Sequence, residues 1–392
     1  MCVSVRQLLL ALLLLLLLSL ATTLSTDTEK MDTMELIETH GFVSQQHQVI
    51  TEDGYVLTLH RIMRQSGPRR PPVLLQHGIL CSSACWVLRG TQKELAIMLV
   101  EAGYDVWLGN VRGNTYCKSH LRLDNTMEKF WNYSFHEMGN YDVPAMIDYI
   151  LAESGQDQLF YVGHSMGTTM FYVMCACRPQ YNAKVRAMFS LAPVAFMSQL
   201  PPLFKLLARY YEQILNLLTQ HRIYEVVPTE PWLSSIEANL CRDGSPFQTF
   251  CVEIAFAIIG RDYTQFNKSM LPMIVEHMSS TNPRTLAHYG QLINSGRFQW
   301  YNWGPEENLA VYGSREPPDY DLSLITAPVS LHYSTNDPLS FEKDVKNLAA
   351  RLPNVIGVFK VPNEHFNHID FLLGTDADSL LYKDIVHLMK KL

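Results

Sequence analysis

The sequence predicts an α/β fold, in which a mostly parallel central sheet has helices on both faces and carries an inserted, mainly helical cap or lid. Three observations predict it. Short apolar runs alternate with helical patterns through the first half of the chain. Over 196–320 this alternation gives way to broad apolar helical patterns. The alternation then resumes with two apolar runs and a final helix, so we expect one sheet interrupted by one insertion.

The first residues have the pattern of a secretory signal peptide. Arg6 precedes a leucine-rich run that is too short and too poorly flanked for a membrane span. A small-x-small cleavage site ends at Ala21, and a second candidate site ends at Ser25. We therefore predict a signal peptide over 1–21, with 25 as the alternative end. No second apolar run of spanning length follows, so no transmembrane segment is expected in the mature chain.

The first part of the core is predicted over 22–195. A leader segment over 32–47 is expected to lie across it, and the next residues form a hairpin pattern around Asp53-Gly54. Strand-like and helical runs then alternate, which is typical of a parallel sheet covered on both faces. The expected strands are 73–76, 104–108, 159–162 and 185–191, and the expected helices include 93–101 and 143–151.

The segment 196–320 is predicted to be a helical cap. Leucine and tyrosine residues over 203–218 give a single expected helix an unusually broad apolar surface. A second apolar stretch covers 254–259, and aromatic residues gather over 298–303. Each stretch alone is consistent with an ordinary core helix. Together they are more apolar than a cover over a polar substrate needs.

The second part of the core is predicted over 321–392. Apolar runs at 327–333 and 355–361 continue the sheet, and a helix over 376–391 ends the chain.

Charge and cysteine content exclude some classes of function. The formal net charge of −7 gives no basic surface for nucleic acid. Of eight cysteines, Cys2 leaves with the signal peptide, and the rest are too few and too scattered for a disulfide-built scaffold. Cys241 and Cys251 close a small loop and are predicted to form a bridge. Cys175 and Cys177 are expected to be small apolar side chains in a helix.

Two glycosylation triplets agree with the signal peptide. Asn132 and Asn267 each begin an Asn-x-Ser sequence. We predict both asparagines as glycosylation sites in a chain that passes through the secretory pathway.

A Gly-x-Ser-x-Gly sequence at 163–167 is the main functional motif. It follows a β-prone run and precedes a helical pattern over 166–177. This context is typical of a nucleophile elbow, in which the serine backbone is strained and the residues two before and two after it must be small. Gly163 and Gly167 meet that requirement. Ser165 is therefore the predicted nucleophile.

A serine nucleophile needs a histidine to accept its proton and a carboxylate to orient that histidine. In the α/β-hydrolase order, both residues follow the serine, and each comes after one of the last strands. Asp337 follows the first of the two late apolar runs and is the candidate acid. Two histidines, His365 and His368, follow the second run, and this pattern leaves both open.

Two backbone N–H groups are expected to bind the developing oxyanion. One belongs to the residue after the serine and the other to the loop after the third strand, which here are Met166 and Ile79. Gly78 allows that loop to turn toward the site. His164 is predicted to be structural rather than catalytic.

These motifs resemble the acid lipase family of animals, which includes gastric lipase and lysosomal acid lipase, over essentially the whole mature chain. The matching stretches are 51–55, 74–78, 106–114, 163–169, 191–193 and 367–371. The resemblance selects His368 over His365 as the base and assigns the acid to Asp337. It also implies a cap disulfide between Cys241 and Cys251.

Two features depart from the family pattern. Met166 stands where the mammalian lipases have glutamine, which leaves the backbone donor intact but alters the pocket wall. The segment 340–363 is slightly longer than in those relatives. Asp337 and His368 are therefore assigned from their own motifs and not from a constant spacing.

The resemblance implies an interfacial serine lipase that is secreted or lysosomal. Its substrates would be fatty-acyl esters, above all triacylglycerols, cleaved through an acyl-enzyme on Ser165 without a metal or cofactor. Its partners would be the lipid substrate and the lipid–water interface. We expect the chain to be a monomer. One alternative is a carboxylesterase or cholesteryl esterase of the same fold. Another is a non-catalytic lipid carrier resembling yolk proteins, which would have no need of all three catalytic residues.

Overall fold

The computed structural model describes residues 30–64, 67, 70–227 and 240–392. The predicted signal peptide lies outside these residues. Among the helices that the structure describes, none combines the length and apolar character that a membrane crossing requires.

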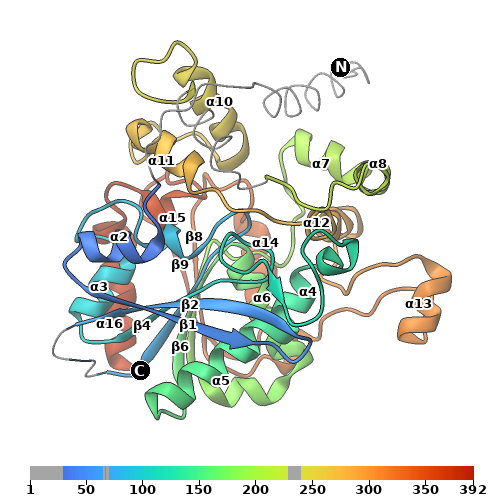
Figure 1. The fold of residues 1–392 in the computed structure, drawn as a ribbon, viewed down its shortest axis with the longest axis horizontal. Coiled ribbons are helices and arrows are strands. Elements are labelled where there is room, and N and C mark those ends of the chain that lie inside the picture. The colour runs from blue at the N-terminus through green and yellow to red at the C-terminus, as the bar shows by residue number, and fades with distance from the viewer. Residues whose placement is uncertain (1–29, 65–66, 68–69, 228–239) are drawn as a thin grey trace.

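A single nine-stranded sheet forms the centre of the molecule (Figure 1). Its order is β1-β2-β4-β3-β6-β7-β8-β9, and β5 pairs with β2 outside this path. Pairing is antiparallel from β1 through β4 and parallel from β4 through β9. The predicted α/β-hydrolase sheet is thus confirmed. The strands are β1 (Val43–Ile50), β2 (Tyr55–Met63), β3 (Pro72–Gln76), β4 (Asp105–Gly109), β5 (Ser119–His120), β6 (Leu159–His164), β7 (Val185–Leu191), β8 (Val329–Tyr333) and β9 (Val355–Lys360).

The start of the core differs from the sequence prediction. The segment expected to be a leader contains helix α2 (Thr33–Thr39) and the first half of β1. A capping box begins this helix, because the Asp32 side chain accepts from the N–H of Glu35 and the Glu35 side chain accepts from the N–H of Asp32. The hairpin between β1 and β2 turns at Asp53-Gly54 as predicted, with Gly54 at a φ of 99°.

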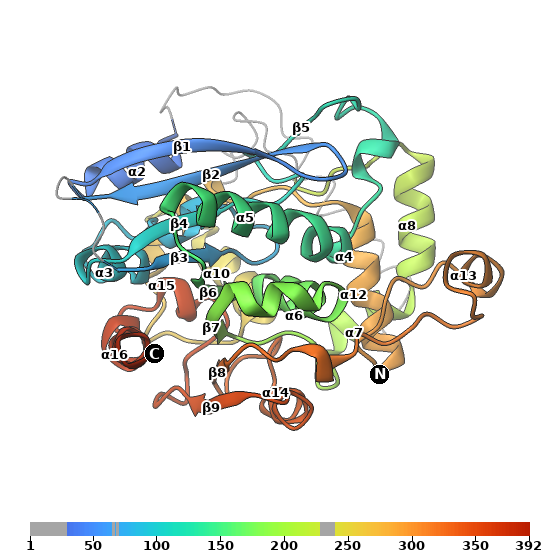
Figure 2. The ribbon, with the colours of Figure 1, turned by 90° about the horizontal axis from the view of Figure 1, so that it is seen from below.

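Helices cover both faces of the sheet (Figure 2). Successive residues of β3 point to opposite faces: Leu74 packs with the core of one face, and Val73 and Leu75 pack with the core of the other. Because both faces are buried at the centre of the sheet, inner strands such as β3 and β6 are buried along their whole length and do not alternate between apolar and polar residues. The helices of the core are α3 (Leu95–Glu101), α4 (Phe135–Glu137), α5 (Val143–Ser154), α6 (Met166–Cys177), α14 (Glu342–Ala349), α15 (Asp370–Leu373) and α16 (Lys383–Lys391).

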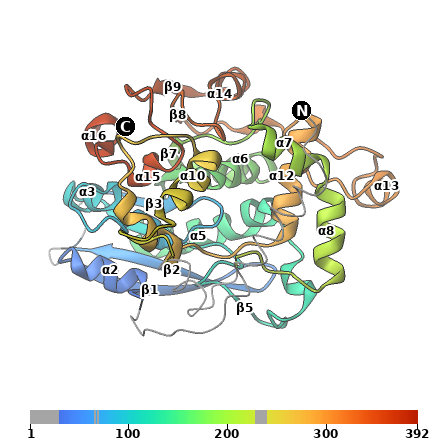
Figure 3. The ribbon, with the colours of Figure 1, turned by 90° about the horizontal axis from the view of Figure 1, so that it is seen from above.

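Between β7 and β8 the described residues are mainly helical. Figures 1 and 3 show helices of this segment gathered over one end of the sheet. The N–H of His368 donates to the carbonyl of Ile259 at 3.0 Å, so this end is the one at which the parallel strands finish. The helices are α7 (Pro202–Arg209), α8 (Tyr211–Gln220), α10 (Gln248–Ile259), α11 (Leu271–Glu276), α12 (Pro283–Ser295) and α13 (Pro305–Tyr312).

The prediction of one helix over 203–218 is wrong, because α7 and α8 are separated at Tyr210. Both helices pack against α12. At the break, Asn294 of α12 donates from Nδ2 to the carbonyl of Ala208 at 2.6 Å. This side chain satisfies a carbonyl that the next turn of a continuous helix would have bound.

Candidate active site

Ser165 occupies the turn between β6 and α6. Its backbone has φ 53° and ψ −119°, a region that residues with a side chain rarely adopt. The turn is held on both sides, because the N–H of Ser165 donates to the carbonyl of Leu191 at 3.0 Å and its carbonyl accepts from the N–H of Thr168 at 2.8 Å. The strained conformation is therefore fixed by the sheet and by the first turn of the helix.

Glycines at 163 and 167 are required by close backbone contacts. A Cβ atom on Gly163 would lie 2.7 Å from the carbonyl carbon of Gly167. A Cβ atom on Gly167 would lie 2.3 Å from the carbonyl oxygen of Gln76 in β3. Real Cβ atoms do not approach backbone atoms this closely, so the helix can cross the strands here only without these side chains.

The structure brings Ser165, His368 and Asp337 together. His368 Nε2 lies 2.8 Å from Ser165 Oγ, and His368 Nδ1 lies 2.8 Å from Asp337 Oδ2. The second oxygen of Asp337 accepts from the N–H groups of Leu339 at 2.8 Å and Ser340 at 3.0 Å. All three side chains of the Ser165–His368–Asp337 set are buried. With the Nδ1 proton donated to the carboxylate, Nε2 is free to accept the serine proton.

The other candidate histidine lies outside this set. His365 is exposed, and its contact with the neighbouring loop is through its carbonyl, which accepts from Asn336 Nδ2 at 2.5 Å. The imidazole that approaches Ser165 is that of His368.

His164 contacts the backbone of His368. Its Nε2 lies 2.9 Å from the His368 carbonyl oxygen and donates to it. Burial lowers the pKa of His164 to about 3, so this ring is neutral. This hydrogen bond holds the backbone of the loop that carries the candidate base.

The two proposed oxyanion donors flank the nucleophile. Ile79 follows β3, and Met166 is the first residue of α6. The loop passes close to the serine, since a Cβ atom on Gly78 would lie 3.0 Å from Ser165 Cβ. Among the described residues, no hydrogen bond takes up the N–H of Ile79 or Met166. Both donors are therefore available to an oxyanion.

Sequence reasoning matched 106–114 to a family motif without giving its residues a role. In the structure, Asn114 donates from Nδ2 to His77 Nε2 at 3.2 Å, and His77 Nδ1 donates to the Gly78 carbonyl at 2.7 Å. Burial lowers the pKa of His77 to about 4, which keeps this bridging ring neutral. The motif thus supports the loop that carries Ile79.

The same motif contributes a buried cation. Arg112 is 1% exposed and donates to Asp142 on one side and to Asp53 in the hairpin turn on the other, with contacts of 2.6 Å to each. Its Cζ lies 3.9 Å from the ring of Tyr55. A buried guanidinium with two carboxylate partners ties the hairpin to the loop after β4. No single-residue signal in the sequence distinguishes it from a surface arginine.

The remaining predicted residues lie in the cap, on the surface and in α6. Cys241 and Cys251 form a disulfide, as predicted. Cys175 is buried and Cys177 is half-buried. The side chains of Asn132 and Asn267 are both exposed. In the described part of the chain, no group of three or more His, Cys, Asp or Glu side chains is arranged to hold a metal ion.

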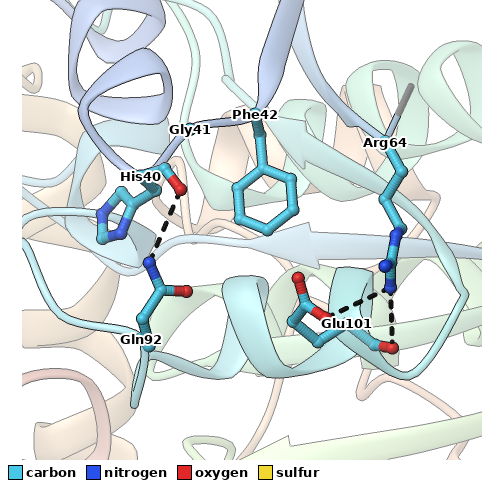
Figure 4. A pocket seen from close by; sticks show the side chains of 6 residues that line it. All are labelled: His40, Gly41, Phe42, Arg64, Gln92 and Glu101. Atoms are coloured by element: carbon cyan, nitrogen blue, oxygen red, sulfur yellow. Dashed lines mark hydrogen bonds and ion pairs between the residues drawn. The ribbon is translucent and has the colours of Figure 1, made fainter.

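A surface pocket of about 340 Å³ lies apart from the serine (Figure 4). Inside it, Arg64 Nη1 donates to the Glu101 carboxylate at 3.2 Å, and Gln92 Nε2 donates to the His40 carbonyl at 3.5 Å. Its charged groups are therefore paired with one another. It shares no residue with the Ser165–His368–Asp337 set.

Two family profiles match the chain. The profile described as a partial alpha/beta-hydrolase lipase region matches residues 33–90. The profile described as the alpha/beta hydrolase fold matches residues 71–227.

Curated relatives match nearly the full length. The chain is 41% identical to Lipase 1 of Drosophila melanogaster, over 94% of this chain and 80% of that protein. It is 38% identical to Lipase 3 of the same species, over 92% and 93%. It is 35% identical to gastric triacylglycerol lipase of Bos taurus, over 92% and 91%.

Solved structures show the same fold at low identity. A putative lipase from Sulfolobus solfataricus superposes with a TM-score of 0.61 at 14% identity, covering 89% of this chain and 94% of that one. A thermophilic esterase from Thermogutta terrifontis superposes with a TM-score of 0.52 at 14% identity, covering 88% and 98%. At this level of identity, these similarities support a shared fold and nothing more.

Proposed function

Because the chain belongs to the α/β-hydrolase lipase family that includes gastric triacylglycerol lipase, we propose that it is a serine lipase of the secretory pathway that hydrolyses triacylglycerols. The observation that carries this proposal is the pair of 2.8 Å hydrogen bonds that links Asp337 through His368 to Ser165. A buried carboxylate, a histidine and a serine in this order form the relay that activates a hydroxyl for acyl transfer.

In the proposed reaction, Ser165 Oγ attacks the acyl carbonyl while His368 Nε2 takes its proton. Asp337 stabilises the imidazolium that forms, and the N–H groups of Ile79 and Met166 bind the oxyanion. His368 then gives the proton to the leaving alcohol, which leaves an acyl-enzyme on Ser165. A water molecule, activated by His368, releases the fatty acid and restores the serine.

We propose a division into a core over 22–195 and 321–392 and a cap over 196–320. Ser165 is 6% exposed, so its side chain is largely covered in this arrangement. The cap presents large apolar side chains to solvent, which indicates a surface for lipid rather than for water. We propose that this surface meets the lipid–water interface and that the cap shifts there to open the site. The exposed apolar residues of α7, α8 and α10 include Leu203, Leu207, Leu217, Phe250, Ile254 and Ile258.

The proposed location is secreted or lysosomal. The signal-peptide pattern and the two exposed sequon asparagines support it. The disulfide between Cys241 and Cys251 supports it as well, because such bonds persist in oxidising compartments.

The test is fatty-acid release from emulsified triolein and from a short soluble ester, by the protein and its Ser165→Ala variant, at about pH 5 and about pH 7.5. Serine-dependent release from triolein supports the lipase. Cleavage of the soluble ester alone would make the protein an esterase. No serine-dependent cleavage of either substrate would favour the lipid carrier and overturn the proposal.

A further inference from the structure

The end of α10 and the loop after it are fastened to the loops that carry the candidate acid and base. The Ile259 carbonyl accepts from the N–H of His368 at 3.0 Å, and the Gly260 carbonyl accepts from Asn367 Nδ2 at 3.1 Å. The Arg261 carbonyl accepts from Asn336 Nδ2, next to Asp337, at 2.8 Å. Three consecutive carbonyls of the proposed cap therefore hold the two loops that position His368.

The segments joined by these hydrogen bonds also carry two buried carboxyl groups. Asp262 follows these carbonyls and is 1% exposed, and Asp370 begins α15 and is fully buried. Asp262 Oδ1 accepts from the N–H and Oγ1 of Thr264, at 2.6 and 2.7 Å, and from the N–H of Gln265 at 3.0 Å. Asp370 Oδ2 accepts from the N–H of Asn367 at 2.7 Å.

The remaining oxygens, Asp262 Oδ2 and Asp370 Oδ1, are buried and have no hydrogen-bond partner among the described residues. The two carboxyl groups are close enough that charge and hydrogen bonding from Asp262 both raise the pKa of Asp370. Two ionised carboxylates cannot form such a bond, since neither has a hydrogen to donate. One proton held between them would give both unpartnered oxygens a partner, as in other buried carboxyl pairs.

The donors decide which group carries the proton. Asp262 accepts hydrogen bonds from three donors, whereas Asp370 accepts from one. The carboxyl group with fewer donors is the better site for a proton. Burial raises the pKa of Asp370 to about 8, and the charges of Asp262 and Asp337 act in the same direction. In this arrangement the proton belongs on Asp370, with Oδ1 as the donor and Asp262 Oδ2 as the acceptor. The other titratable groups nearby are His368, two residues before Asp370, and the hydroxyl of Tyr382, which donates to the carbonyls of Phe371 and Leu372.

We propose that Asp262 and Asp370 are a positioning pair, in which one shared proton locks the loop after α10 to the start of α15 and keeps His368 within hydrogen-bonding distance of Ser165. The inference rests on the proposed serine hydrolase function, because the pair acts only through His368.

Removing the shared proton places two negative charges side by side in a buried site. Repulsion between Asp262 and Asp370 then separates the two segments and loosens the contact between Ile259 and His368. The folded pKa of Asp370, about 8, lies above its ordinary value of 3.8, so the folded protein holds a proton that the unfolded chain releases. The contribution of this pair to stability is therefore fully present below the ordinary pKa of 3.8 and is lost as pH rises through the folded pKa of about 8.

The experiment measures kcat for a short soluble ester between about pH 5 and about pH 10. Asp370→Asn replaces the donating Oδ1–H by an Nδ2–H and needs no shared proton. We expect kcat of this variant at about pH 6 within twofold of the wild type and an alkaline decline at least one pH unit higher. Asp370→Ala lacks the donor and is expected to lose at least tenfold in kcat at every pH.

Asp376→Asn is the matched control, because Asp376 also accepts from the loop after α10, through Gln265 Nε2 at 3.1 Å, but is exposed. Its alkaline decline should coincide with that of the wild type. The proposal is overturned if Asp370→Asn declines at the wild-type pH, if it is as slow as Asp370→Ala, or if Asp376→Asn shifts the decline equally.

A second readout separates this inference from the proposed function. The Tm of the wild type should fall between about pH 6 and about pH 9, and that of Asp370→Asn or Asp262→Asn should fall less. If the wild type shows no Ser165-dependent hydrolysis, the proposed function fails while the Tm comparison still tests the shared proton. Equal falls of Tm in the wild type and both variants would overturn the pair.

Discussion

The helix after Ser165, α6, and helix α8 of the proposed cap both carry many apolar side chains, yet they are buried to opposite degrees. Ten of the twelve residues of α6 are buried, whereas α8, with ten residues, has none. The apolar side chains of α6 are needed to hold a strained serine, and those of α8 contact solvent. Apolar side chains thus build the core in α6 and meet solvent in α8. Substitutions in the two helices should therefore have different effects on stability and on activity.

The largest effect is expected from Ser165→Ala in the elbow. Without the hydroxyl, hydrolysis of any ester should fall by about 10³-fold or more, because no residue replaces the nucleophile. The Tm should stay within a few degrees of the wild type, as the change removes one buried oxygen. Equal activity of variant and wild type on triolein would contradict the assignment of Ser165.

Gly167→Ala tests whether the elbow depends on close contact. Its Cβ would meet the Gln76 carbonyl oxygen at 2.3 Å, so we expect a loss of about 3 kcal/mol in the free energy of unfolding, with loss of activity. Gly41→Ala is the control, because Gly41 has φ 81° but no atom within 4 Å of the new Cβ. Backbone strain alone should cost it about 1 kcal/mol. Urea unfolding of both variants measures the difference, and equal losses would contradict the steric explanation.

Removing the disulfide should affect the cap and spare the elbow. Cys241 and Cys251 are ten residues apart and belong to a small apolar cluster, with Val252 and Phe256, that is separate from the two main cores. The double alanine variant is expected to lose about 2.5 kcal/mol of local stability. Hydrogen exchange should accelerate in α10 and remain unchanged in α6. Faster exchange in both helices would show that cap and core unfold together.

The smallest effect on the fold, and the most selective on activity, is expected from the exposed face of α8. Leu217→Glu should lower hydrolysis of emulsified triolein about tenfold and leave hydrolysis of a short soluble ester within about twofold. Asn216→Glu adds the same charge at the neighbouring exposed position and should leave both activities near the wild type. Equal losses on the two substrates, or equal effects of the two variants, would contradict a lipid-binding role.

Much of the core could be predicted from sequence because its signals are local. Buried strands are short apolar runs, and the expected run 185–191 coincides with β7. The two glycines of the elbow are required by close contacts around the turn between β6 and α6. The Gly-x-Ser-x-Gly sequence therefore predicted both the shape of this turn and the nucleophile that it carries. Asp337 and His368 could be assigned because each follows a recognisable strand.

Features set by contacts between distant segments could not be predicted. The break at Tyr210 accompanies a hydrogen bond from Asn294, which lies 86 residues from its acceptor Ala208. Asp370 lies inside a motif that was noted for its histidine alone, and its partner Asp262 precedes it by more than a hundred residues. In a single sequence, each of these aspartates has the pattern of a helix cap or a turn residue.

The distance along the chain between the two halves of the candidate site determines when the site can be completed. Ser165 and His368, whose side chains meet at 2.8 Å, are 203 residues apart. At usual rates of protein synthesis, roughly 10 to 40 s separate the appearance of the two residues. During that interval a nascent chain can form the elbow but has no base to activate its serine. A chain that stops before β9 is complete should therefore be inert toward esters, so hydrolysis begins only once the last strand has been made and docked.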